Sequence, residues 1–111
     1  MQTSSDYRDG ILTVRYLGEL DHYAATEALR AVETAGEEYM PRCCVLDFSQ
    51  LTFMDSSGIA VILRAERILQ QSGAELRIVG CNRQVCRVLE LSGLGEMIRD
   101  TNDRREECGL H

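Results

Sequence analysis

Residues 51–63 read LTFMDSSGIAVIL, and the central residues Asp55, Ser56, Ser57 and Gly58 stand where strand-like sequence passes into helix-like sequence. The start of a helix exposes unpaired backbone N–H groups at the positive end of the helix dipole. A serine at this position can therefore be a helix cap, a nucleophile or an acceptor of a phosphate group. The rest of the chain decides among these three roles.

The segments on both sides of this stretch predict an α/β fold. Asp9 and Gly10 lie between two β-rich runs and predict a hairpin turn. Strands are predicted over residues 4–8, 11–17, 43–48, 75–79 and 97–99. Helices are predicted from Asp21, as N-cap, to Pro41, and over residues 56–71 and 83–92. Because strands and helices alternate after the hairpin, we expect a mixed, mostly parallel sheet of four to five strands with three to four helices.

This order of elements also predicts where a functional site lies. Parallel strands end at one edge of a sheet, so the loops at Asp21, at residues 55–58 and at residues 80–82 should converge there. Binding sites of open α/β sheets favour this edge. The run 59–63 is apolar around almost the whole circumference of its helix. We therefore expect one side of it to form an exposed docking patch beside the serines.

The composition bounds the class of protein. The chain has 111 residues, of which 44% are hydrophobic, which predicts one domain over residues 1–111. Its core is expected at about residues 4–99, with a polar tail or short helix at 100–111. The formal net charge of −6 disfavours binding to nucleic acid or to an anionic membrane surface. Because all twelve cationic side chains are arginines, Schiff-base chemistry and P-loop lysine chemistry are excluded.

Signals for export, membrane insertion, cofactors and metals are absent from the sequence. No apolar run reaches the length of a membrane span, and residues 1–6 lack the features of a signal peptide, so we expect a cytoplasmic protein. The five cysteines have neither C-x-x-C nor zinc-site spacing, and His111, three residues after Cys108, is the one histidine near any of them in the sequence. They are therefore predicted to be small apolar side chains in a reducing compartment, with a redox role as the alternative.

Three roles compete for Ser56. Serine commonly caps a helix, although Asp55 and Ser57 could do the same. A nucleophilic Ser56 needs a base, and only His22, beside Asp21 on the expected edge, could serve, while the G-x-S-x-G elbow is missing. A phosphoacceptor role for Asp55 of the receiver type fails because the chain has no lysine. We therefore expect no catalytic residue, and a docking patch whose charge a phosphate on serine would change.

The motif resembles the signature of the STAS domain. Within that family it is most similar to the bacterial anti-sigma factor antagonists. The stretches GELDH at residues 18–22, GAEL at 73–76 and LSGL at 91–94 match three further landmarks of the family. The resemblance extends from about residue 4 to residue 99.

The resemblance implies a switch between partners without enzymatic activity. Ser56 would be phosphorylated by an anti-sigma factor of the histidine-kinase-like ATPase fold, and a metal-dependent serine phosphatase would reverse the reaction. The unphosphorylated antagonist would bind the anti-sigma factor and so free a sigma factor for transcription. Partner-binding residues are expected on the shared edge and on the following helix: Asp21, His22, Asp55, Ser57, Gly58 and the exposed sides of Ile59 and Ile62. The alternative is a STAS subunit of a lipid-transport ABC complex or of a signalling scaffold.

Overall fold

Six strands and three α-helices make up residues 1–99, which are the residues that the computed structural model describes. The strands are β1 (Gln2–Arg8), β2 (Ile11–Leu20), β3 (Cys43–Asp47), β4 (Leu51–Met54), β5 (Glu75–Val79) and β6 (Ile98–Arg99). The helices are α1 (Ala25–Tyr39), α2 (Ser56–Gln71) and α3 (Arg83–Leu91), and a short 3₁₀ helix, η1 (Gly95–Met97), precedes β6. The predicted tail or short helix at 100–111 lies outside this range.

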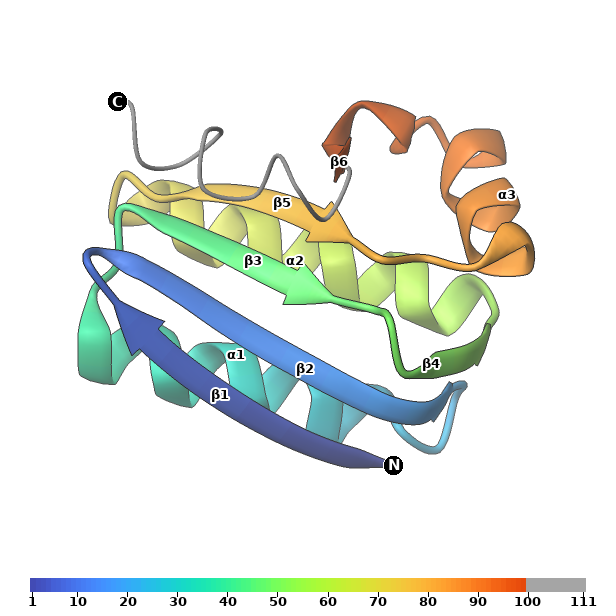
Figure 1. Ribbon diagram of the computed structural model, residues 1–111, viewed down its shortest axis with the longest axis horizontal. Coiled ribbons are helices and arrows are strands. Elements are labelled where there is room, and N and C mark those ends of the chain that lie inside the picture. The colour runs from blue at the N-terminus through green and yellow to red at the C-terminus, as the bar shows by residue number, and fades with distance from the viewer. Residues whose placement is uncertain (100–111) are drawn as a thin grey trace.

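The sheet has the order β1-β2-β3-β5-β6, with β4 paired to the end of β2 (Figure 1). β1 and β2 are antiparallel and join at Asp9 and Gly10, whose φ angles of 54° and 84° are typical of a two-residue hairpin turn. All the other strand pairs are parallel. The predicted hairpin and the mostly parallel α/β sheet are both confirmed.

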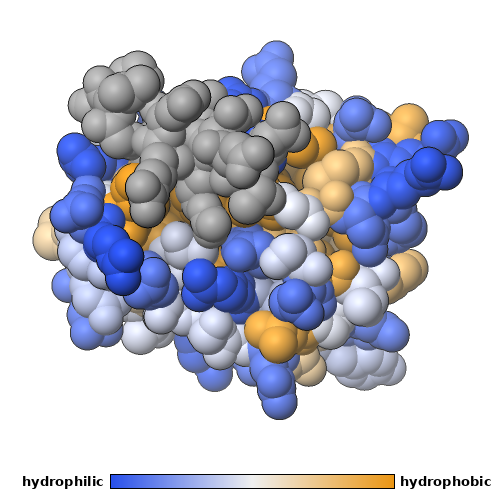
Figure 2. Space-filling model, viewed as in Figure 1, coloured by the Kyte–Doolittle hydropathy of each residue, from blue (hydrophilic) through white to orange (hydrophobic). Residues whose placement is uncertain are grey.

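Alternation along the strands separates the two faces of the sheet. Leu12, Val14 and Tyr16 of β2 belong to the main core, and α1 and α2 both cover this face (Figure 1). Ile11 points to the opposite face, where it packs against a small buried cluster of Cys43, Val45 and Val79. Figure 2 shows this second face, on which hydrophobic surface appears in small patches among hydrophilic residues.

β4 is a strand that the sequence-based prediction missed, so the sheet has six strands where four to five were expected. It has four residues and, among residues 1–99, pairs only with Gly18–Leu20, the last residues of β2. The register shifts between Gly18 and Glu19, and Gly18 has a φ of 110° that favours glycine. This irregularity lets β2 continue past the predicted end at residue 17 and gives β4 a partner.

The predicted role of Asp21 as the cap of the first helix is wrong. α1 begins at Ala25, and its N-cap, Ala24, makes no side-chain cap. The Asp21 carboxylate instead accepts hydrogen bonds from the backbone N–H groups of Tyr23 and Ala24, each at 3.1 Å. Asp21 therefore stabilises the turn between β2 and α1, a common use of aspartate in loops.

The cysteines of the described residues are mostly in disulfides. Cys81 and Cys86 form a disulfide and Cys43 is also disulfide-bonded, so the prediction of reduced cysteines is wrong for these three residues. Within residues 1–99 only Cys44 is a free cysteine, and it is buried in the core as predicted. No helix in the described part of the chain is long and apolar enough to cross a membrane.

Candidate functional site

Ser56 is the first residue of α2, and its side chain is exposed. The N-cap is Asp55, which has an extended backbone and accepts a hydrogen bond from the Ser57 N–H at 2.8 Å. Its carbonyl oxygen also accepts a hydrogen bond from the Gly58 N–H at 3.0 Å. Within residues 1–99 the Ser56 hydroxyl has no hydrogen-bond partner. Capping therefore falls to Asp55 and leaves the Ser56 hydroxyl free.

The pairing of β4 with β2 brings the predicted loops together. Leu20 is paired with Met54, so Asp21 and Asp55 follow at neighbouring positions on adjacent parallel strands. Such strands are about 4.8 Å apart. The Asp55 N–H also approaches the Leu20 carbonyl oxygen at 3.4 Å. Asp21 and Ser56 consequently leave the sheet at the same edge.

The third predicted loop reaches the same edge through two side chains at the start of α3. The Asn82 amide donates hydrogen bonds to the carbonyl oxygens of Leu51 and Thr52, at 3.2 and 3.3 Å. The Gln84 amide donates to the Met54 carbonyl oxygen at 2.9 Å and accepts from the Met54 N–H at 3.1 Å. These bonds satisfy β4 on its free side, and the predicted convergence of the three loops is confirmed.

Gly58 is buried where α2 packs directly onto the ends of two strands. A Cβ atom at this position would lie 2.3 Å from Cγ of Met54 and 3.1 Å from Cδ2 of Leu20. Only glycine therefore allows this approach, which fixes the height of Ser56 above the sheet edge. Gly58 positions the site from inside the protein.

The exposed face of α2 differs from the predicted one. Ile62 is completely buried in the core, so the expectation that it has an exposed side is wrong. Ile59 is half-buried, and Leu63 is the large apolar side chain that faces outward, with 47% of its surface exposed. Ser56, Ala60 and Leu63 follow one another at helical spacing and form one exposed stripe.

Two exposed aromatic side chains near this edge were missed in the sequence analysis. Tyr23 has 91% of its surface exposed, and its ring meets the exposed His22 ring edge to face at 5.6 Å. Phe53 is 39% exposed and is paired with Glu19 across β2 and β4. The sequence carried one signal for these exposed aromatic residues: Tyr23 lies two residues after Asp21, and Phe53 lies two residues before Asp55. We define the Ser56 surface as Asp21, His22, Tyr23, Phe53, Ser56, Ile59 and Leu63.

The family model of the STAS domain matches residues 3–108. The chain belongs to the STAS-domain family. An anti-sigma F factor antagonist of Paenibacillus polymyxa is 35% identical to this STAS domain over 94 residues, which cover 85% of this chain and 80% of that protein. An anti-sigma-B factor antagonist of Listeria monocytogenes is 31% identical over 94 residues, covering 83% of this chain and 80% of that protein.

Solved structures show the same STAS fold. The unphosphorylated anti-sigma factor antagonist SpoIIAA has a TM-score of 0.84 at 24% identity, and 99% of each chain is covered. The Bacillus cell fate determinant SpoIIAA in its phosphorylated form has a TM-score of 0.74 at 23% identity, covering 99% of this chain and 100% of that one. The predicted STAS fold, with its N-terminal hairpin, is confirmed.

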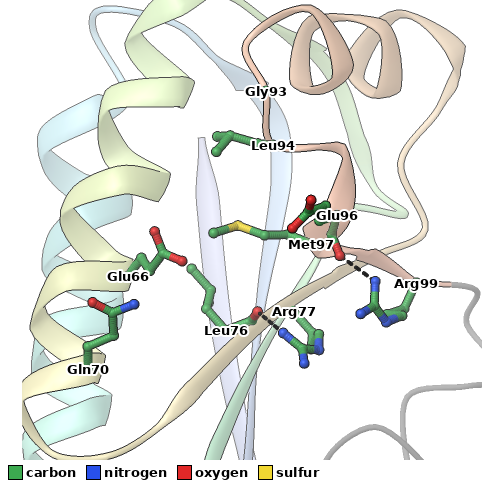
Figure 3. Close-up of a pocket in the computed structure, with 9 residues that line it drawn as sticks. All are labelled: Glu66, Gln70, Leu76, Arg77, Gly93, Leu94, Glu96, Met97 and Arg99. Carbon is green, nitrogen blue, oxygen red and sulfur yellow. Dashed lines mark hydrogen bonds between the residues drawn. The ribbon is translucent and has the colours of Figure 1, made fainter.

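The STAS domain also has a cavity of about 330 Å³ between α2, β5 and the segment around η1 (Figure 3). Arg77 and Arg99 in its lining donate hydrogen bonds to backbone carbonyl oxygens, and Arg77 also pairs with Glu75 at 2.9 Å. Glu66, another lining residue, is ten residues beyond Ser56, about 15 Å along α2. The cavity is therefore distinct from the Ser56 surface.

Chemical groups around Ser56 favour an acceptor over a nucleophile. His22 lies on the same edge, but no base is hydrogen-bonded to the Ser56 hydroxyl within residues 1–99. The described residues also contain no group of three His, Cys, Asp or Glu side chains that could hold a metal ion. The exposed hydroxyl instead stands in the first turn of a helix, where the positive end of the helix dipole favours an added anion.

Proposed function

We propose that this STAS domain is an anti-sigma factor antagonist that is switched by phosphorylation of Ser56. The proposal rests on one observation. The Asp55 side chain caps α2, and the neighbouring Ser56 hydroxyl is exposed and makes no hydrogen bond within residues 1–99. The curated relatives at 35% and 31% identity are named as anti-sigma factor antagonists. Unphosphorylated protein would bind the anti-sigma factor and thereby release a sigma factor for transcription.

A phosphate on Ser56 would leave the fold intact. It adds about two negative charges in the first turn of α2, where the dipole stabilises an anion. The same charges would stand beside Asp21 and Asp55, whose strands are neighbours. A partner surface that accommodates this acidic edge would then meet a concentrated negative charge. A loss of about 3–4 kcal/mol in binding free energy weakens affinity by two to three orders of magnitude.

The Ser56 surface is the proposed contact with the anti-sigma factor. Asp21 and His22 flank Ser56 on the edge of the sheet, and Ile59 and Leu63 continue the surface along α2. Tyr23 adds the most exposed large hydrophobic side chain of the described residues. Asp55 and Ser57 contribute through the cap and Gly58 through packing, whereas Ile62 is too deeply buried to touch a partner.

Partner proteins would add the phosphate to Ser56 and remove it. The anti-sigma factor would be a serine kinase of the histidine-kinase-like ATPase fold, which supplies ATP. A metal-dependent serine phosphatase would remove the phosphate. The antagonist itself would be a substrate without catalytic residues, cofactor or metal, and it would act in the cytoplasm, where sigma factors meet RNA polymerase.

A paired capture experiment tests the switch. Ser56→Ala and Ser56→Asp proteins are used as baits in native lysate depleted of Mg-ATP, and the retained proteins are identified by mass spectrometry. We expect a kinase-like anti-sigma factor on the Ala bait and its loss from the Asp bait. Identical partners on both baits would contradict the switch and favour a constitutive scaffold or a transport subunit.

Ser57→Ala provides a matched control. Ser57 takes part in the cap through its backbone N–H, so removal of its hydroxyl leaves the bond to Asp55 in place. With the captured kinase and Mg-ATP, we expect the wild-type and Ser57→Ala proteins to gain the mass of one phosphate and the Ser56→Ala protein to gain none. Phosphorylation of the Ser56→Ala protein would overturn the assignment of the acceptor.

A further inference from the structure

The disulfide between Cys81 and Cys86 encloses the start of α3. Cys81 precedes Asn82, the N-cap of α3, and Cys86 lies in the first turn of the helix. Their Cα atoms are 5.6 Å apart, within the usual range for a disulfide. Both residues are half-buried, so the bridge does not lie deep in the core. The first turn of a helix also favours the thiolate, which is the reactive form of cysteine.

The residues enclosed by this bridge hold β4 in place. Asn82 and Gln84 make four hydrogen bonds to the backbone of β4. Asn82 also caps α3 by accepting a hydrogen bond from the Val85 N–H at 2.9 Å. On its other side β4 is paired, within the described part of the chain, only with the last three residues of β2. The start of α3 is therefore the second support of a four-residue strand.

β4 in turn positions Ser56. Met54 is the last residue of β4, and its backbone N–H donates a hydrogen bond to the Gln84 amide, while its carbonyl oxygen accepts one from it. Its side chain fills the space above Gly58, and Asp55 follows it directly as the cap of α2. A continuous set of contacts thus connects the Cys81–Cys86 bridge with the Ser56 segment.

We propose that Cys81 and Cys86 are a reversible dithiol–disulfide pair whose oxidation state sets how firmly α3 holds β4 and the Ser56 segment. Oxidation proceeds by exchange with a low-molecular-weight disulfide such as glutathione disulfide. One cysteine thiolate attacks this disulfide and releases one thiolate, and the second cysteine thiolate then displaces the other. The protein loses two protons and two electrons, and the small disulfide becomes two thiols. Reduction frees the first turn of α3 to open locally, which weakens the support of β4.

Hydrogen exchange tests this proposal without any partner protein. The full chain is equilibrated with glutathione disulfide or with reduced glutathione, and the state of each cysteine is read by differential alkylation and mass spectrometry. Amide exchange of residues 51–58 is then compared between the two samples. We expect exchange about tenfold faster in the reduced sample, which corresponds to about 1.4 kcal/mol in the free energy of local opening.

Variants separate this bridge from the other disulfide. Cys81→Ser and Cys86→Ser each remove the bridge, while reduction still acts on the disulfide of Cys43. We expect both variants to exchange at the reduced rate in residues 51–58 under either condition. The proposal fails if glutathione disulfide leaves Cys81 and Cys86 alkylatable, if wild-type exchange is the same in both samples, or if the variants still respond to reduction as the wild type does. Neither amide exchange nor cysteine alkylation depends on phosphorylation, so failure of this proposal can be distinguished from failure of the proposed function.

Discussion

The Asp55 carboxylate accepts a hydrogen bond from the backbone N–H of Ser57, one residue beyond Ser56, at 2.8 Å. Because this bond caps α2, the hydroxyl of Ser56, which lies between the two residues in the sequence, is not needed as a cap. The cap of α2 and the proposed phosphorylation therefore fall on different side chains of one motif.

The cap is expected to depend on Asp55 and not on Ser56. Asp55→Ala removes the bond to the Ser57 N–H and should lower the free energy of unfolding by about 1 kcal/mol. Asp55→Asn keeps an acceptor oxygen and should restore most of this loss. Ser56→Ala, at an exposed position, should change stability by less than about 0.5 kcal/mol. Urea unfolding of the three variants measures these differences, and an equal loss for Ser56→Ala would contradict the assignment.

Gly58→Ala is expected to destabilise the protein although alanine is the better helix former. The new Cβ would lie 2.3 Å from Cγ of Met54, and such overpacking costs about 1–3 kcal/mol. Gly36→Ala in α1 is the matched control, because the nearest atom there is 3.7 Å away on Leu69. That control should gain up to about 1 kcal/mol from helix propensity. Thermal unfolding measures the stability of both variants. A Gly58→Ala protein as stable as the Gly36→Ala protein would show that α2 can move away from Met54.

Tyr23 is expected to be a main contact of the Ser56 surface. Tyr23→Ala should weaken binding to the anti-sigma factor at least about tenfold, because exposed tyrosines often dominate the energy of interfaces. Stability should be unchanged, since 91% of the side chain is exposed. Met40→Ala is the control: Met40 is 71% exposed and follows the opposite end of α1, about 22 Å from its start. Calorimetric titration measures the affinity of the Tyr23→Ala and Met40→Ala proteins for the anti-sigma factor. Equal affinities would show that Tyr23 is not part of the interface.

The stability of the protein is expected to fall at alkaline pH because of two buried groups. Burial raises the pKa of the Cys44 thiol from 9.0 to about 12. Burial and the nearby Cys44 raise the pKa of Tyr16, whose hydroxyl donates a hydrogen bond to the Ala28 carbonyl oxygen at 2.6 Å. The folded protein therefore keeps protons that the unfolded chain releases. Stability is complete below the ordinary pKa values and is lost above them, by up to about 1.4 kcal/mol per pH unit for each group.

Cys44→Ala isolates the thiol in this pH dependence. The variant should lose the part of the alkaline slope that begins near pH 9.0, and it should keep the part due to the burial of Tyr16, which is the larger cause of the raised pKa of that residue. Urea unfolding at a series of pH values from neutrality upward gives the slope for each protein. Identical slopes for the two proteins would show that Cys44 ionises as readily in the folded state as in the unfolded chain.

Local patterns in the sequence predicted those parts of the structure that depend on neighbours along the chain. The Asp9–Gly10 hairpin, the alternation of strands and helices and the start of α2 at Ser56 all carry such signals. The convergence of three loops followed from the parallel order of the strands alone.

The missed features depend on contacts between distant segments. β4 exists because β2 continues through the irregularity at Gly18, which no local pattern announces. The buried side of α2 was ambiguous because residues 59–63 are all apolar, so periodicity could not distinguish Ile62 from Leu63. Cys81 and Cys86 meet only because a turn and the start of α3 bring them together.

The tight contact between Gly58 and Met54 has a consequence for how such proteins diversify. It holds the Ser56 hydroxyl at one height above the sheet, while side chains such as Tyr23 and Leu63 are exposed and lie outside the core. The exposed side chains of this surface can therefore change, and with them the partner that it fits, while the packing that positions Ser56 stays the same.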